Sequence, residues 1–158
     1  MSIDQTIALD GFQSVYGRGG TVVARAPGRV NIIGEHTDYN HGFVLPMAID
    51  RDTVLVAAPR DDRIITVYSK NLDRHASVDL RNPTRNESEP WVDYIAGVAH
   101  MLQESGRTLS GADVYVMGDV PLGSGLSSSA SLEVAVVSMF EALSDFTVPD
   151  KEAAEICL

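Results

Sequence analysis

The stretch GDVPLGSGLSSSASLEVAVVSMFEAL, residues 118–143, decides how this chain folds. Its first part is rich in turn formers, including Gly123 and Gly125, and leads into three consecutive serines at 127–129 that are possible helix caps. An apolar run with helical spacing follows from 130 to 143. A loop that enters a helix attracts anions, because the first amides of a helix lack partners within it and glycine lets a ligand come close. The stretch therefore predicts an anion-binding loop.

Two familiar phosphate loops do not match this stretch. Ser124 stands where a Walker A loop needs its lysine, and Ser128 replaces the third glycine of a dinucleotide fingerprint. A plain strand-to-helix turn, capped by serine and without a ligand, remains as the alternative. The three adjacent serines count against that alternative, because one cap needs only one hydroxyl.

The helix expected over 130–143 is apolar on nearly every side. A helix of this kind is buried at the centre of a domain. Burial would fix the helix axis, so that the loop amides are aimed rigidly and little ordering cost falls on the ligand.

The composition limits the class of protein. The chain has 158 residues, of which 44% are apolar and 22% are charged, as in an ordinary globular domain. Its 12 basic and 22 acidic residues give a net charge of −10, and no basic cluster offers a surface to nucleic acid. Cys157 is the only cysteine, which excludes a disulfide framework or a thiolate zinc site and fits a reducing compartment. No apolar run approaches the length of a membrane span, so we expect a cytoplasmic protein without a membrane partner.

The rest of the chain predicts one α+β domain with no internal repeat or linker. Helical spacing of apolar residues predicts helices over 3–16, 91–104, 130–143 and 151–158. Strand-like segments, separated by glycine, proline or charged residues, are expected at 21–26, 30–33, 43–49, 53–58, 64–68, 77–80 and 112–117. The segments between 43 and 80 indicate a meander. The last helix reaches Leu158 without a capping residue, which is typical of a chain interrupted within an element, and we expect a fragment.

A second group of polar residues lies in RAPGRVNIIGEHTDYNHG, residues 25–42. Apolar strand candidates bracket its polar loop and would hold it rigidly at a sheet edge. The carboxylates of Glu35 and Asp38 can accept hydrogen bonds from ligand hydroxyls, and His36 can donate or accept. Arg29 is a fixed cation able to stabilise a developing anion. This set of side chains is typical of a site for a polyol.

This loop has two other interpretations. It could be a solvated surface loop with no ligand. A metal site formed by Glu35, His36, Asp38 and His41 is disfavoured, because neither a helical pair of histidines nor a thiolate supports zinc.

Together the two stretches resemble the galactokinase branch of the GHMP small-molecule kinases. APGRVNIIGEHTDYNHGFVLPMAID (26–50) is similar to the galactokinase signature, and PLGSGLSSSASLEVA (121–135) is similar to the ATP-binding motif of the family. The likeness continues in APRDDR (58–63), WVDYIAGV (91–98) and AAEICL (153–158), so it covers essentially the whole chain. Two long motifs in the right order are a more specific signal than either glycine loop alone.

The resemblance implies an α+β fold, the N-terminal domain of the GHMP kinases, of the ribosomal protein S5 domain 2-like type. This fold is a mixed sheet with helices packed on one face. Residues 1–158 would form the domain incompletely, with the galactokinase signature at 26–50, the ATP-binding motif within 118–135 and the C-terminal domain absent.

The resemblance also implies the reaction, which is transfer of the γ-phosphoryl group of ATP, with Mg²⁺ as cofactor, to the anomeric hydroxyl of galactose. Glu35, His36 and Asp38 would bind sugar hydroxyls, with Asp38 on the pair that includes the C4 hydroxyl. Arg29 would be catalytic, because it would favour the deprotonated form of the reacting hydroxyl. The residues around the triphosphate would be Leu122, Gly123, Ser124, Gly125, Leu126, Ser127, Ser128 and Ser129, and Ser129 would also bind magnesium.

The chain departs from the family in its length. Relatives are more than twice as long, and their catalytic aspartate, in a CGIMDQ-like motif, is expected just beyond residue 158. The missing C-terminal half of the same polypeptide would close the cleft around both substrates. We therefore expect a galactokinase of which this portion is inactive alone. A non-catalytic protein that binds galactose or ATP and a kinase for N-acetylgalactosamine are the alternatives.

Overall fold

The structure is a computed structural model that describes residues 3–38, 40, 42–121, 123 and 125–157, except for the side chains of Glu35 and Asp38. Its helices are α1 (Gln5–Tyr16), α2 (Glu35–Asp38), α3 (Asp93–Glu104), α4 (Ser128–Ser144) and α5 (Asp150–Ile156), with a 3-10 turn, η1 (Pro90–Val92), directly before α3. Its strands are β1 (Val22–Ile33), β2 (Leu45–Arg60), β3 (Ile64–Ser69), β4 (Arg74–Asp79) and β5 (Gly111–Gly118).

The five strands form one sheet in the order β1-β2-β5-β3-β4. All neighbouring pairs are antiparallel except β3 and β5, which are parallel. The expected mixed sheet is therefore confirmed, but the meander is wrong, because β5 lies between β2 and β3. Because β5 is the central strand, the segment after Gly118 leaves the sheet at the middle of the row of strand ends.

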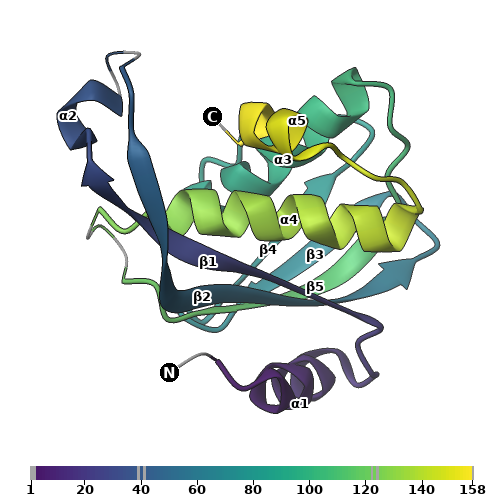
Figure 1. Cartoon of the computed structure of the whole chain (residues 1–158). Coiled ribbons are helices and arrows are strands. Elements are labelled where there is room, and N and C mark those ends of the chain that lie inside the picture. Colours follow the sequence, from purple (N-terminus) through teal and green to yellow (C-terminus); the bar gives the residue numbers. More distant parts are fainter. Residues whose placement is uncertain (1–2, 39, 41, 122, 124, 158) are drawn as a thin grey trace.

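The helices cover both faces of the sheet, unequally. Figure 1 shows α3, α4 and α5 on one face and α1 on the other. Along β2, Leu55 belongs to the apolar cluster under α4, whereas Val54 and Val56 belong to the cluster with Phe12 of α1. This alternation follows from the period of two along a strand and explains why β2 is apolar on both faces. Helices on one face are thus confirmed for α3, α4 and α5, while α1 adds a layer on the other face.

The helix expected over 130–143 is confirmed as α4, which begins two residues earlier at Ser128. Six of its residues are buried, including Val136, Met139 and Phe140, and its contacts are with β1, β2, α3 and α5. Its burial matches the expectation from its apolar sequence. No helix among the described residues has both the length and the apolar character needed to cross a membrane.

Two strands are longer than the sequence indicates. Pro27 does not end β1, because β1 is an edge strand and a proline there costs no hydrogen bond to a further strand. A shift of register between Pro27 and Arg29 absorbs the irregularity. In β2, the charged residues 50–52 continue the strand, because Asp50 and Arg51 are exposed to solvent while the buried Asp52 is paired with Arg25.

The polar loop after β1 contains a short helix, α2, which the sequence does not indicate. Thr37 Oγ1 donates hydrogen bonds to Gly34 O at 2.9 Å and to Phe43 O at 2.8 Å, and Thr37 O accepts one from Gly42 N at 2.8 Å. Through these bonds Thr37 holds the two ends of the connection between β1 and β2 together. As a result α2 sits at the far tip of the β1–β2 hairpin, at the same end of the molecule as the start of α4 (Figure 1).

Candidate functional site

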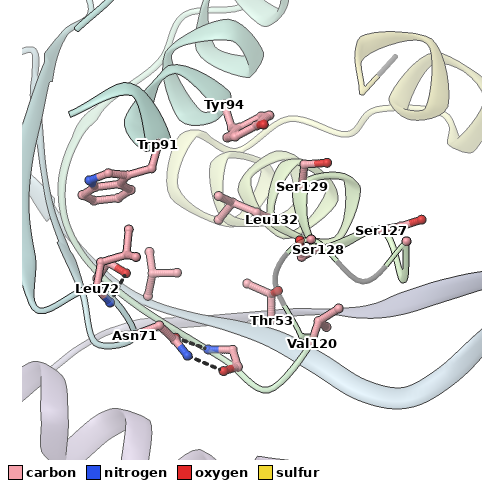
Figure 2. A pocket seen from close by; sticks show the side chains of 15 residues that line it. Thr53, Asn71, Leu72, Trp91, Tyr94, Val120, Ser127, Ser128, Ser129 and Leu132 are labelled. Atoms are coloured by element: carbon pink, nitrogen blue, oxygen red, sulfur yellow. Dashed lines mark hydrogen bonds between the residues drawn. The ribbon is translucent and has the colours of Figure 1, made fainter. Parts of the chain in front are cut away.

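A cavity of about 540 Å³ opens at the first turn of α4. This size is within the range of about 300–1,000 Å³ that is usual for small-molecule sites. The residues around it come from both halves of the chain, and Figure 2 shows ten of them with labels. They are Thr53, Ser69, Asn71, Leu72, Trp91, Tyr94, Val116, Gly118, Val120, Gly123, Gly125, Ser127, Ser128, Ser129 and Leu132.

The predicted anion-binding loop forms one side of this cavity. Gly123 and Gly125 have φ angles of 69° and 74°, which favour glycine, and a Cβ at either position would meet no atom within 4 Å. The loop is therefore open to a ligand rather than packed against protein. Leu122 and Ser124, which belong to the same prediction, lie outside the described residues.

The three serines are available for a ligand. Ser127 is the N-cap of α4 in a left-handed conformation, but its side chain makes no capping hydrogen bond. Within the described part of the chain, the hydroxyls of Ser128 and Ser129 have no hydrogen-bond partner either, and all three residues are only partly buried. Ser127 is thus the N-cap by position, as predicted, but none of the three hydroxyls makes a capping hydrogen bond among the described residues.

The start of α4 is fixed to the sheet by one buried polar residue. Ser131, 2% exposed, has its Oγ 2.8 Å from Ala26 O of β1 and 2.9 Å from Thr53 Oγ1 of β2. Such a bond in the core holds the helix against the strands with a defined rotation and depth. The first amides of α4, and the positive end of its dipole, are thereby aimed at the cavity.

The beginning of the loop is held on two sides. Asn71 Nδ2 donates to Gly118 O at 2.7 Å, and Asn71 Oδ1 accepts from Gly118 N at 2.9 Å. One residue later, Asp119 N donates to Asp52 O at 3.0 Å and Asp52 N donates to Asp119 Oδ1 at 2.7 Å. These hydrogen bonds therefore fix the direction in which the chain leaves β5.

The end of the loop is bonded to the strand that carries Arg29. Arg29 N donates to Leu126 O at 3.1 Å, on the open edge of β1. Gly28 is buried at this contact, and a Cβ there would lie 3.0 Å from Leu126 O, which is tighter than a normal contact. Glycine at this position thus lets the two segments that carry the family motifs touch. The Arg29 side chain itself is exposed and is not among the residues around the cavity.

The predicted sugar-binding residues share one short element. Glu35, His36 and Asp38 all fall in α2, and His36 is exposed. His36 O accepts a hydrogen bond of 2.8 Å from Asn40 Nδ2, which helps to hold the turn after the helix. The side chains of Glu35 and Asp38 and the whole of His41 lie outside the described residues, so their roles stay predictions.

The opposite wall of the cavity is aromatic, and sequence reasoning missed it. Trp91 and Tyr94 reach toward the cavity from η1 and α3 in Figure 2, across from Leu132. Trp91 Nε1 donates to Glu89 Oε2 at 2.7 Å, and this bond, reinforced by Arg74, lowers the pKa of Glu89. Tyr94 is 45% exposed. Their spacing in sequence predicts a helix but does not distinguish a core face from a ligand wall, which an aromatic pair at the start of a helix also suits.

The fit of the site to magnesium is limited to Ser129. Mg²⁺ prefers oxygen ligands and is usually held by one or two carboxylates together with substrate phosphates and water. Ser129 offers a hydroxyl without a partner among the described residues, at the cavity, but no acid lies among the residues around the cavity. In the described part of the chain no three His, Cys, Asp or Glu residues gather as a metal site. Ser129 therefore fits as one ligand, with phosphate oxygens needed for the others.

Comparison with known proteins agrees with this arrangement. The chain matches the family model "Galactokinase galactose-binding signature" over residues 10–59 and the model "GHMP kinases N terminal domain" over residues 93–158. Curated galactokinases of Chloroflexus aggregans and a Roseiflexus species are 50% and 49% identical to it over 143 residues, which are 90% of this chain. This chain belongs to the galactokinase family of GHMP kinases. It spans 37% and 36% of the length of those two relatives.

Solved structures give the same result for the fold. The crystal structure of Lactococcus lactis galactokinase complexed with galactose aligns with a TM-score of 0.87 and 34% identity, over 97% of this chain and 40% of that chain. Mevalonate kinase of Methanococcus jannaschii aligns with a TM-score of 0.74 over 89% of this chain and 45% of its own. At 19% identity, the second likeness concerns the fold alone. The expected N-terminal fold of the GHMP kinases is thus confirmed.

Proposed function

We propose that the protein to which this chain belongs transfers the γ-phosphoryl group of ATP to the anomeric hydroxyl of galactose. The observation that carries the proposal is the hydrogen bond from Arg29 N to Leu126 O. It joins the strand of the galactose-binding signature to the loop at the start of α4. A sugar bound beyond the end of β1 and a triphosphate bound at α4 would then be neighbours, and phosphoryl transfer depends mainly on such positioning.

The nucleotide fits the cavity in two parts. The triphosphate would lie at the first turn of α4, where free amides, the helix dipole and the hydroxyls of residues 127–129 favour an anion. The base would lie against Trp91 and Tyr94, since a planar ring gains from an aromatic and apolar wall. Local donors thus offset the net charge of −10, which by itself repels ATP.

The sugar would be held at α2. Glu35 and Asp38 would accept hydrogen bonds from its hydroxyls, and His36 would add a third polar group. The galactose complex of the Lactococcus lactis relative supports this choice of ligand. Arg29, a permanent cation, would favour the deprotonated form of the reacting hydroxyl. The aspartate expected to accept the proton of that hydroxyl belongs to the region predicted beyond residue 158.

Ser129 is the residue that we propose as the magnesium ligand of this chain. When bound, the metal would neutralise charge on the phosphate oxygens. The residues of the loop would still bind and orient the triphosphate through their amides, because backbone donors need no metal. The location in the cytoplasm predicted from the sequence belongs to this proposal as well.

An assay of ADP release by the whole protein tests the proposal. We expect ADP to form from ATP when galactose is added and not when glucose replaces it. Comparison of galactose with N-acetylgalactosamine separates the two kinases considered above, and a clear preference for the acetylated sugar would correct the substrate. Binding of galactose or ATP without any turnover by the whole protein would instead identify a non-catalytic binding protein.

A further inference from the structure

Asn71 is not part of either family motif, yet it bonds to Gly118, where the anion-binding loop between β5 and α4 begins. This loop is the proposed phosphate loop. It follows the end of β3 and lies among the residues around the cavity (Figure 2). Its side chain is exposed, so packing does not account for its position. Both hydrogen-bonding ends of the amide are directed at one residue, because Gly118 N and Gly118 O bond to Asn71 Oδ1 and Nδ2 at 2.9 and 2.7 Å.

The register of the sheet explains this geometry. β3 and β5 run parallel, with Ser69 opposite Val116, and Lys70 N donates to Val116 O at 2.8 Å. Two residues further along both strands, Asn71 stands opposite Gly118. The main chain of β3 has ended there, and the side-chain amide of Asn71 supplies the donor and the acceptor that a continued strand would supply.

The other side of Gly118 is held by the sheet. Gly118 pairs with Thr53 of β2, and Asp119 exchanges two hydrogen bonds with Asp52. Gly118, from which the loop begins, is therefore held by β2 on one side and by Asn71 on the other. The loop is open at Gly123 and Gly125, since Cβ atoms at these positions would meet nothing within 4 Å. Val120 is buried, but near Gly123 and Gly125 the loop direction depends on how the chain is fixed on either side, at Gly118 and at Leu126.

We propose that Asn71 is a positioning residue that holds the origin of the phosphate loop and so prepares it for the triphosphate. The inference rests on the proposed function, because it assumes that the loop binds the phosphates of ATP. It acts through Gly118 and not through contact with the substrate. Loss of the amide would let the loop sample more conformations before binding, and ordering it again would weaken phosphate affinity.

Calorimetry with two ligands, ATP and inorganic tripolyphosphate, tests this role in the wild-type protein and in Asn71→Ala. We expect the variant to bind both ligands about tenfold more weakly, a change worth about 1.4 kcal/mol, with galactose affinity unchanged. Asn82→Ala is the matched control, because Asn82 is exposed, makes no side-chain hydrogen bond among the described residues and lies away from the cavity. It should bind ATP like the wild type.

Three other results would contradict the positioning role of Asn71 or the proposed function. If Asn71→Ala weakens ATP but not tripolyphosphate, Asn71 contacts the base and the positioning role is wrong. Equal affinities in both proteins would overturn the inference and leave the proposed function intact. A wild type that binds neither ligand would remove the proposed function, and the inference with it.

Amide hydrogen exchange without ligand gives an independent readout. The amide of Gly118 should exchange at least tenfold faster in Asn71→Ala than in the wild type, while amides in the middle of β5 keep their protection. Unchanged exchange at Gly118 would show that the side chain does not hold this residue, whatever ATP does. Faster exchange throughout β5 would indicate general loosening of the sheet and would likewise refute a local role.

Discussion

Arg29 contributes to the candidate site through its backbone, and we propose that its charge acts on the reacting hydroxyl. Its amide donates to Leu126 O at 3.1 Å and joins β1 to the phosphate loop, while its side chain is exposed. The two roles are separable, because any substitution other than proline keeps the amide. Substitution of the Arg29 side chain therefore tests its action on a substrate without removing the main-chain contact between the strand and the loop.

Asp38 is predicted to bind the sugar. For Asp38→Asn in the whole protein we expect the KM for galactose to rise by an amount equal to about 1–3 kcal/mol, because the amide strands a polar partner. The KM for ATP should not change. Steady-state kinetics with each substrate varied in turn measures both values. Asp10→Asn, on the exposed face of α1, is the control for the loss of one charge. An unchanged KM for galactose would argue against the role.

Asp113 stabilises the fold rather than the site. Buried on β5, it accepts hydrogen bonds from Thr66, Arg60 and Arg18 at 2.6–3.1 Å. Burial raises the pKa of Asp113, but these bonds outweigh it and hold the pKa below its usual value.

For Asp113→Asn we expect a loss of about 1–2 kcal/mol in the free energy of unfolding at neutral pH, a modest figure because the arginines are partly exposed to solvent. A lowered pKa means that the stabilisation is complete above about pH 4 and disappears as the carboxylate is protonated at lower pH. Wild type and variant should therefore converge on acidification in urea unfolding. Asp61→Asn, exposed and without a partner among the described residues, is the control. A gap that stays constant down to pH 3 would contradict this account.

At the scale of elements, the contact between β1 and the phosphate loop depends on Gly28. In Gly28→Ala the new methyl group would lie 3.0 Å from Leu126 O, so the strand and the loop must separate by a few tenths of an ångström. We expect a loss of stability of about 1 kcal/mol and ATP binding that is several-fold weaker. Calorimetry and urea unfolding measure the two effects. Gly19→Ala, where a Cβ meets nothing within 4 Å, should change neither. Normal ATP affinity in Gly28→Ala would show that the contact does not matter for binding.

The existence of most elements could be predicted from local patterns, but their pairing could not. Helical spacing predicted α1, α3, α4 and α5 because that pattern is local. The extent of β1 could not be predicted, since Pro27 is tolerated only because no strand lies beyond β1 in the sheet. The same holds for β5, whose place between β2 and β3 depends on contacts between distant segments.

For the candidate site, too, some residues could be predicted from the sequence and others could not. The glycine and serine loop and the Arg29 strand could be predicted, because their residue types carry the chemistry. The wall formed by Trp91 and Tyr94 could not be predicted, since the spacing of a helix face is the same whether protein or a ligand lies opposite. Asn71 gave no signal, because its role depends on the register of two strands that are far apart in sequence.

At the scale of the whole molecule, one region of the chain exposes several large apolar side chains. Ile32, Ile33, Leu45 and Met47, at the outer end of the β1–β2 hairpin, are between 50% and 70% exposed. Neighbouring apolar side chains that face water favour association. The chain also spans 37% of its Chloroflexus aggregans relative, so partners for this surface are expected elsewhere in a longer polypeptide.

We expect residues 1–158 produced alone to have marginal stability and no turnover. Thermal unfolding should be broad and begin at a low temperature, and an apolar dye should bind before unfolding. The whole protein is the control and should show neither property. A sharp transition at high temperature without dye binding would refute the first expectation, and galactose-dependent ADP release by the chain alone would refute the second.

The central claim is that the start of α4 holds the triphosphate while the end of β1 and α2 hold the sugar, as parts of one site. A crystal structure of the whole protein with galactose and a non-hydrolysable ATP analogue tests it most directly. We predict the γ-phosphate at residues 125–129, the sugar at α2, and the anomeric hydroxyl between that phosphate and Arg29. A nucleotide bound away from α4, or a sugar too far from the γ-phosphate for transfer, would contradict the account.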